Sequence, residues 1–190
     1  MFEAFIAWDD RTFRLVNGAW QHPTLDVLLP FMTDLANFIP LAAVLAVSLV
    51  VWGGLRGRRF VVTAVVTVLV ADAVSTYLFK YTILRLRPCN ALEGVRLLVG
   101  CTASPSFPSN HAVNMSALAT LVALYARPLL IPAAAAAVTV AYSRVYVGVH
   151  YPLDVLAGCL LGIAVAFALS RGIIAKVSAQ RSAISGQPRQ

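Results

Sequence analysis

The sequence predicts an all-α fold: a polytopic membrane helix bundle of about five to six transmembrane helices, preceded by an N-terminal interfacial helix. Hydrophobic residues make up 59% of the 190 residues and charged residues only 12%, and the mean hydropathy is +0.79. A soluble domain of this composition would lack polar surface. Apolar runs of membrane length recur along the chain and leave room for little else. We therefore expect residues 1–190 to form a single membrane domain.

The first expected element is an amphipathic helix over residues 1–20 that lies on the membrane surface. Phe2, Trp8 and Phe13 are interspersed there with charged residues such as Asp9 and Arg11. This mixture is typical of an interfacial helix and is too charged to span a bilayer. The segment also lacks the basic start and cleavage site of a signal peptide.

The apolar runs that follow are separated by polar residues, glycine or proline. The first run contains Asp34, Asn37 and Pro40. It therefore forms either one long kinked helix or a short interfacial segment followed by a shorter span. The expected spans cover residues 25–53, 60–80, 110–126, 129–147 and 151–173.

Basic residues outside the motifs indicate the orientation of the bundle. They lie at or after the ends of the first, third and fifth expected spans, so five spans bring them to one face, which the positive-inside rule assigns to the cytoplasm. The polar residues 174–190 then form a flexible cytoplasmic tail. This placement accounts for much of the net charge of +7 without a nucleic-acid partner. The basic residues of this group are Arg56, Arg58, Arg59, Arg127, Arg171, Lys176, Arg181 and Arg189.

Two of the three cysteines lie in the long loop expected over residues 81–108. These are Cys89 and Cys101, whereas Cys159 lies within an apolar span. On the outer side of the membrane, an oxidising compartment would let Cys89 and Cys101 form a disulfide. The alternative is that both are free and act as small apolar residues.

Three short stretches gather the most reactive side chains, and the first covers residues 80–88. Lys80 ends a span, and Arg87 directly precedes Pro88, which stops a helix from continuing. Taken alone, these two cations fit snorkelling anchors at a helix end. Arg85 and Arg96 belong to no motif, so we expect them to act as anchors or to contact lipid headgroups.

The second stretch, residues 107–111, lies where a loop becomes a helix, with Ser109 placed as the N-cap. A helix N-terminus offers unpaired backbone N–H groups to an anion, and the Ser109 hydroxyl adds another donor. His111 would point from the first turn toward the bound group. Taken alone, the stretch also fits a plain N-cap followed by an interfacial histidine.

The third stretch, residues 143–154, places Arg144 at the end of one span and His150 and Asp154 at the start of the next, four residues apart on one helical face. A carboxylate beside one ring nitrogen holds a histidine in one tautomer and frees the other nitrogen to attack or to accept a proton. Asp154 is costly near the end of a span without a partner or a function. An isolated His–Asp pair also fits a structural hydrogen bond.

Together the three stretches resemble the type 2 phosphatidic acid phosphatase superfamily, whose pattern is Lys-x6-Arg-Pro, Pro-Ser-Gly-His and Ser-Arg-x5-His-x3-Asp. One named position departs, because Asn110 stands where the family usually has glycine. Asparagine tolerates unusual backbone angles, so we expect the backbone donor to survive, while the side chain crowds the phosphate pocket and changes the preference among headgroups. The matching residues are Lys80, Arg87, Pro88, Pro108, Ser109, His111, Ser143, Arg144, His150 and Asp154.

The resemblance implies a phosphatase that needs no metal or other cofactor and works through a phosphohistidine. In this scheme His150 attacks phosphorus, Asp154 orients the ring of His150, and His111 protonates the leaving oxygen. Fixed positive charges neutralise the phosphoryl oxygens. The implied phosphate-binding residues are Lys80, Arg87, Arg144, Ser109 and, through its backbone N–H, Asn110.

The position of the motifs at helix ends favours an amphiphilic substrate that enters from the outer leaflet. The length, the surface helix and the segment LDVLLPFMTDLANF are most similar to small bacterial members that convert undecaprenyl pyrophosphate to undecaprenyl phosphate at the outer, periplasmic face of the inner membrane. Phosphatidylglycerol phosphate, phosphatidic acid, lipid A 1-phosphate and phosphotransfer to another lipid stay open. The expected partners are the lipid substrate and the bilayer, with no obligatory protein partner.

The competing hypothesis is a lipid transporter or scaffold that keeps the site as a lipid-binding pocket. Asp34 and Asp72, both within expected spans, would then mark a polar path across the membrane. Otherwise these carboxylates make hydrogen bonds between helices, with partners such as Thr33, Ser75 or Thr76.

Overall fold

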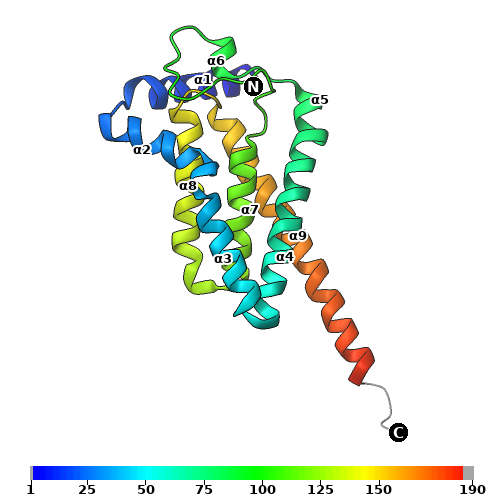
Figure 1. The fold of residues 1–190 in the computed structure, drawn as a ribbon. Coiled ribbons are helices and arrows are strands. Elements are labelled where there is room, and N and C mark those ends of the chain that lie inside the picture. Colours follow the sequence, from blue (N-terminus) through cyan, green and yellow to red (C-terminus); the bar gives the residue numbers. More distant parts are fainter. Residues whose placement is uncertain (1, 186–190) are drawn as a thin grey trace.

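The structure is a computed structural model that describes residues 2–185, with side chains described for residues 3–171. Within this range it contains helices and no strands, which confirms the predicted all-α membrane bundle (Figure 1). The elements are α1 (Phe2–Arg14), η1 (Leu15–Ala19), α2 (Pro23–Thr33), η2 (Leu35–Phe38), α3 (Ile39–Val51), α4 (Gly54–Ala73), η3 (Val74–Lys80), α5 (Tyr81–Ile83), α6 (Pro88–Ala91), α7 (Asn110–Tyr125), η4 (Arg127–Leu129), α8 (Leu130–Tyr146) and α9 (Pro152–Ser185).

The predicted interfacial helix corresponds to α1 and η1, which lie across one end of the bundle (Figure 1). Phe13 and Val16 are buried, whereas Phe5 and Trp8 are exposed. The ring of Phe13 packs against that of Tyr151, with 5.6 Å between their centroids. The helix is therefore held over the turn between α8 and α9, while its exposed apolar side chains suit contact with lipid.

Three stretches are long and apolar enough to cross a membrane: Gly54–Ala91, Arg127–Tyr146 and Pro152–Arg171. The bent pair α2 and α3 makes a fourth. Helix α7 has only 16 residues, yet it runs through the middle of the bundle beside the others (Figure 1). By length and composition the described residues thus contain three or four spans, and the shorter α7 lies among them. The expected number of five to six spans is met only approximately.

The first apolar run folds as α2 and α3, with a bend of 68° at η2. Asp34 lies at this break, where its Oδ1 accepts a hydrogen bond from the backbone N–H of Ala36 at 3.1 Å. Its carboxylate is exposed and caps η2. Asp34 thus marks a break between two helices rather than a polar position inside a continuous span.

Helix α7 packs against α9, α8 and α4. Two glycines of α9 permit the closest of these contacts: a Cβ atom at Gly158 would lie 2.7 Å from the carbonyl oxygen of Ser109, and one at Gly162 would overlap the carbonyl of Val113. Small residues let membrane helices approach each other in this way. The start of α7 is consequently fixed beside the start of α9, where the second and third motifs lie.

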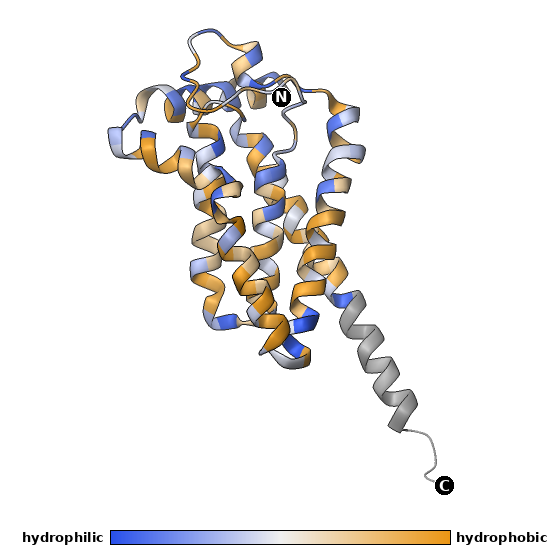
Figure 2. Cartoon of the chain, viewed as in Figure 1, coloured by the Kyte–Doolittle hydropathy of each residue, from blue (hydrophilic) through white to orange (hydrophobic). Residues whose placement is uncertain are grey.

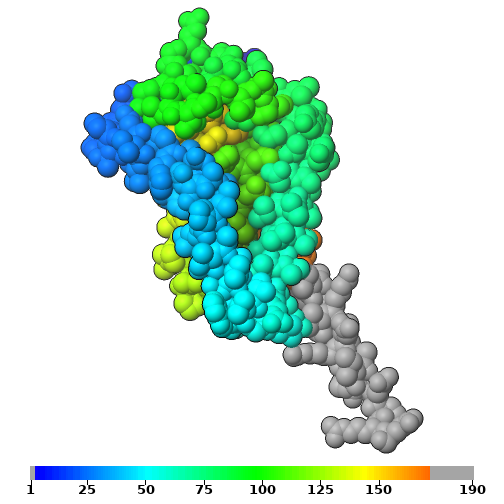
Figure 3. All heavy atoms as spheres, viewed as in Figure 1, coloured from blue at the N-terminus to red at the C-terminus, as the bar shows by residue number. Residues whose placement is uncertain are grey.

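Apolar residues extend along the bundle and polar residues gather toward its two ends (Figure 2). The loop over residues 84–109 covers the end where α1 lies (Figure 1). Below this loop the surface is hollowed between α2–α3 and α4–α5, and part of α7 and the gold segment near residue 150 are visible inside (Figure 3). The hollow gives the motif-bearing end of the bundle a lateral opening.

The last helix is longer than expected. Helix α9 runs to Ser185, through most of the segment for which we expected a flexible tail, and residues 186–190 lie outside the described residues. Residues 175–185 contain three alanines, one lysine, one glutamine and one arginine, all of which favour helix.

Candidate active site

His150 lies in the turn between α8 and α9, not in the first turn of α9 as expected. Pro152 takes the first position of α9, where proline is favoured because it lacks an N–H group. Gly148 has a φ of +91°, which lets the chain turn sharply after α8. The backbone N–H of His150 donates to the carbonyl of Arg144 at 3.2 Å. The turn therefore links the end of α8 to the histidine.

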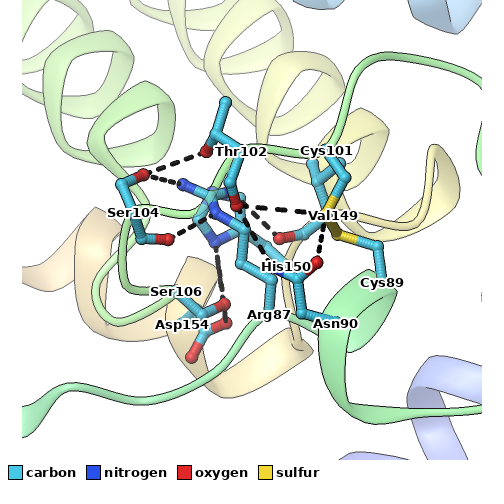
Figure 4. The surroundings of a disulfide bond; sticks show 10 residues. All are labelled: Arg87, Cys89, Asn90, Cys101, Thr102, Ser104, Ser106, Val149, His150 and Asp154. Carbon is cyan, nitrogen blue, oxygen red and sulfur yellow. Dashed lines mark hydrogen bonds and ion pairs between the residues drawn. A yellow bond between two sulfur atoms is a disulfide. The ribbon is translucent and has the colours of Figure 1, made fainter.

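The imidazole of His150 is buried and has different neighbours at its two nitrogens (Figure 4). Nη1 of Arg87 lies 3.1 Å from Nε2. Ser106 Oγ and Asp154 Oδ2 lie 3.3 and 3.6 Å from Nδ1. A guanidinium can only donate, so Nε2 carries the lone pair and Nδ1 the proton. The network thus leaves Nε2 as the reactive nitrogen.

Burial lowers the pKa of His150 to about 3, and the nearby guanidinium groups act in the same direction while Asp154 opposes them. An imidazole with this pKa is neutral at neutral and mildly acidic pH. The unprotonated ring is the form that can act as a nucleophile.

Asp154 is fully buried in the first turn of α9. Its Oδ2 accepts from the backbone N–H of Tyr151 at 2.9 Å and from the hydroxyl of Ser106. Its Oδ1 accepts from Nη1 of Arg85 at 2.8 Å. The carboxylate is therefore held from three sides beside Nδ1 of His150.

Arg87, from the first motif, is held by the loop that follows it. Its Nε donates to the carbonyl of Ser104 at 2.8 Å and its Nη2 to the Ser104 hydroxyl at 2.9 Å. Cys89 follows Arg87 closely, and Cys101 precedes Ser104. The disulfide between the two cysteines therefore joins the chain segment of Arg87 to the segment of Ser104 (Figure 4).

Lys80 and Arg144 also lie at this end of the bundle. Lys80 Nζ donates to the carbonyl of Pro105 at 2.8 Å, and Arg144 Nη1 donates to Thr33 Oγ1 at 2.6 Å. Lys80, Arg87 and Arg144 are only 6%, 7% and 9% exposed. Within the described residues, no carboxylate forms a salt bridge with any of the three. Burying cations without counterions costs free energy, so this end of the bundle favours the binding of an anion.

Ser109 is the N-cap residue of α7, but its hydroxyl makes no capping hydrogen bond. In the described part of the chain, this buried Oγ and the Nε of Arg144 have no hydrogen-bond partner. The backbone N–H of Ser109 donates to the carbonyl of Asp154 at 3.0 Å. Two free donors therefore lie in buried surroundings, and His111 follows in the first turn of α7.

The Asn110 side chain is engaged by α4 and η3. Its Nδ2 donates to Asp72 Oδ1 at 2.8 Å and to Thr76 Oγ1 at 3.1 Å, and its Oδ1 accepts from Ser75 at 2.8 Å. These three bonds hold the carboxamide against α4 and η3, and its effect on the preference among headgroups stays a prediction. Asp72 also accepts from Asn114 at 3.3 Å, which matches hydrogen bonding between helices.

Two expectations about the loop over residues 84–109 are wrong. Arg85 is not a membrane anchor, because its guanidinium bridges Asp154 and Asp9. Arg96 likewise pairs with Asp26 at 2.7 Å. The three carboxylates lie 69, 76 and 70 positions away from their arginines in the sequence, so no spacing pattern could have revealed these pairs.

Sequence reasoning also missed Ser106 and Ser104, which contact His150, Asp154 and Arg87. Ser106 directly precedes the second motif, and its position there was the only available signal. Within the described residues, no group of three or more histidine, cysteine or acidic side chains is arranged to hold a metal ion.

Comparisons with known proteins point to one family. The sequence profile of the PAP2 superfamily matches residues 60–177, which include all three motifs. An undecaprenyl-diphosphatase of Sulfolobus acidocaldarius is 35% identical over 169 residues, or 87% of this chain and 78% of that protein. The undecaprenyl-diphosphatase BcrC of Bacillus subtilis is 29% identical over 84% of this chain and 81% of its own. The crystal structure of Aquifex aeolicus LpxE matches with a TM-score of 0.74 at 26% identity, covering 86% of this chain and 95% of LpxE.

Proposed function

Since this chain belongs to the PAP2 superfamily and is a lipid phosphatase of the membrane, we propose that it hydrolyses a lipid pyrophosphate through a phosphohistidine at His150. The proposed reaction converts undecaprenyl pyrophosphate to undecaprenyl phosphate without a metal ion. It takes place at the outer face of the cytoplasmic membrane.

The three buried cations carry this proposal. Lys80, Arg87 and Arg144 have no carboxylate counterion among the described residues, and Ser109 Oγ and Arg144 Nε are buried without a partner. A phosphoryl group has three oxygens with spread-out negative charge and accepts several hydrogen bonds. It would satisfy these donors and neutralise these charges in one step, and the backbone N–H of Asn110 at the start of α7 would add another donor.

The first chemical step begins at Nε2 of His150. Arg87 would release this nitrogen to bind the phosphate, and Nε2 would attack phosphorus as the bond to the leaving oxygen breaks. His111 would give its proton to that oxygen. The imidazole then carries a positive charge, which the adjacent Asp154 stabilises through the Nδ1 proton. In the second step, water would attack phosphorus and break the N–P bond, with His111 accepting the proton from water.

Two observations support a polyprenyl pyrophosphate as the substrate. The relatives from Sulfolobus acidocaldarius and Bacillus subtilis are both named undecaprenyl-diphosphatases. The lateral hollow beneath the outer loop (Figure 3) would let a headgroup enter while its chain stays in the bilayer. A panel with phosphatidylglycerol phosphate, phosphatidic acid and lipid A in one detergent should give the highest kcat/KM for undecaprenyl pyrophosphate. A higher value for another lipid would reassign the substrate.

The charge distribution supports the outward orientation. Arg56, in the first turn of α4, donates to the carbonyl of Tyr125 at the end of α7, so the basic segments around Arg56 and Arg127 lie together at the end of the bundle away from α1 (Figure 1). The positive-inside rule assigns such an end to the cytoplasm. The motifs at the other end would then face the periplasm or the exterior.

Phosphate release from detergent-solubilised protein in EDTA tests the proposed function. Activity should survive chelation and disappear in His150→Ala and in His111→Ala. His22→Ala is the matched control, because this histidine caps α2 outside the site and its loss should leave the rate unchanged. Activity that EDTA removes and Mg²⁺ restores would contradict the metal-free mechanism. Lipid movement that persists in both variants without phosphate release would favour the transporter.

A further inference from the structure

The N-terminal helix reaches the active site through Asp9, a fully buried residue of α1. Its Oδ1 accepts from the backbone N–H of Leu153 at 2.8 Å, and its Oδ2 lies 2.6 Å from Nη2 of Arg85. The other end of the same guanidinium contacts Asp154 at 2.8 Å. The family match begins at residue 60, so Asp9 lies outside it.

Arg85 is held by several contacts besides its two carboxylates. Its guanidinium lies over the ring of Tyr151, 3.9 Å from the centroid, and its carbonyl accepts from the backbone N–H of Ser106 at 2.7 Å. A planar guanidinium that contacts two carboxylates and an aromatic face has one orientation. Arg85 therefore connects α1, the outer loop and the first turn of α9 at a single point.

The charge count of this cluster bears on the reaction. Two carboxylates share one guanidinium, so the cluster keeps one net negative charge beside Nδ1 of His150. If Asp9 were neutral, Arg85 would cancel the charge of Asp154, and less negative charge would face the imidazole. The difference matters once the ring becomes positive, because a buried opposite charge stabilises that state.

We propose that Asp9 and Arg85 are positioning residues for the orienting carboxylate, so that the surface helix α1 completes the active site. This inference rests on the proposed phosphohistidine at His150. Asp9 acts through Arg85: it fixes the guanidinium that orients Asp154 and offsets part of its positive charge, so the cluster stays net negative when the ring of His150 is phosphorylated.

The chain supplies a matched control. Arg96 comes from the same outer loop, pairs with Asp26 of α2 at 2.7 Å, and lies over the ring of Tyr146 at 4.9 Å. This second cluster also combines an arginine, a tyrosine ring and a carboxylate from an N-terminal helix, although its guanidinium pairs with one carboxylate and not with two. It does not contact His150 or Asp154.

The test compares steady-state kinetics of full-length variants with undecaprenyl pyrophosphate in detergent. Asp9→Asn keeps an acceptor for Leu153 but loses the charge, so kcat should fall roughly tenfold while KM changes less than about twofold. Asp9→Glu should recover part of kcat. Asp26→Asn should stay within about twofold of wild type in both constants.

A double variant separates positioning from a structural role. If Asp9 acts through Arg85, then Asp9→Asn combined with Arg85→Gln should be no slower than Arg85→Gln alone. If the losses of kcat from the two single variants multiply in the double variant, the inference is overturned. It is also overturned if Asp9→Asn and Asp26→Asn lose kcat and thermal stability to the same extent. Failure of the proposed function would look different, because His150→Ala would then stay active whatever Asp9→Asn does.

Discussion

His150 has a donor at one ring nitrogen and an acceptor at the other. Arg87 faces Nε2, whereas Asp154 and Ser106 face Nδ1. This arrangement defines the tautomer without reference to any relative, since a guanidinium can only donate. The chemistry proposed for the chain depends on this tautomer, because Nε2 must keep its lone pair.

The lowered pKa of His150 can be measured directly. Only three histidines are present, so ¹⁵N-histidine labelling in micelles gives one pair of nitrogen signals for each of three imidazole rings, and His150→Ala identifies the signal of His150. This signal should report an Nδ1–H tautomer and show no titration between about pH 5 and 8. A midpoint near 6.5 would contradict the buried, neutral imidazole. The unfolded chain binds a proton at His150 below about pH 6.5, whereas the folded protein binds it only near pH 3. Acidification from about pH 6.5 toward pH 3 should therefore lower the free energy of unfolding.

Ser106 should contribute to catalysis although it belongs to none of the three motifs. Its hydroxyl donates to Asp154 and lies beside Nδ1 of His150. A hydrogen bond to a buried charge is worth about 1.5–3 kcal/mol, so Ser106→Ala should lower kcat roughly 10- to 100-fold. Ser170→Ala removes another buried serine hydroxyl, one that donates to the carbonyl of Phe167. It should leave kcat unchanged, and an equal loss in both variants would contradict a specific role for Ser106.

The sequence could reveal the motif residues, but not the side chains that hold them. Arg85 is 69 positions from Asp154 and 76 from Asp9, and at such separations only the folded chain decides which groups meet. The same applies to Asn110. Its departure from the family pattern was visible, whereas the contact with Asp72 on α4 was not.

At the scale of elements, the loop over residues 84–109 presents Arg87 to the site. Helix α6 begins directly after Arg87, and the disulfide between Cys89 and Cys101 brings the returning segment with Ser104 back to the guanidinium (Figure 4). The cross-link closes the loop and limits the conformations in which this contact is lost.

Loss of this cross-link should weaken substrate binding. The Cys89→Ser/Cys101→Ser variant should show a KM on the order of tenfold higher. Reductant should have the same effect on wild type and none on the double variant. Cys159→Ser removes the free cysteine of α9 and should behave as wild type with and without reductant. Unchanged KM in the double variant would show that Arg87 is held without the disulfide.

The helices themselves followed from hydrophobic runs, but their ends depended on local turns. Pro152 and Gly148 shift His150 out of α9, and Asp34 divides the first run into two helices. The close contact of α7 with α9 depends on which face Gly158 and Gly162 present. That face is fixed by packing among several helices and is not evident from composition.

At the scale of the whole molecule, the two ends of the bundle differ in charge and in structure. One end carries α1, the outer loop and the motif residues, and the other carries the basic turns near Arg56 and Arg127 (Figures 1 and 2). This asymmetry was predictable from the sequence, because loop charge and motif position can be read without knowing any contact.

Thiol labelling of intact cells tests the orientation. In a background with serine at all three native cysteines, an impermeant reagent should label Glu93→Cys and leave Arg58→Cys unlabelled. Both positions are exposed, on the outer loop and in the first turns of α4. Detergent lysis should make Arg58→Cys reactive, which controls for accessibility. The reverse pattern in intact cells would place the site in the cytoplasm.

The most direct test of the account is to trap the phosphoenzyme. Undecaprenyl pyrophosphate labelled at the terminal phosphate should be mixed with protein in EDTA and quenched within one turnover. We expect an acid-labile, base-stable label that maps to His150 and is absent from His150→Ala. Phosphate release by wild type without any such label, or a label on another residue, would contradict catalysis through a phosphohistidine at His150.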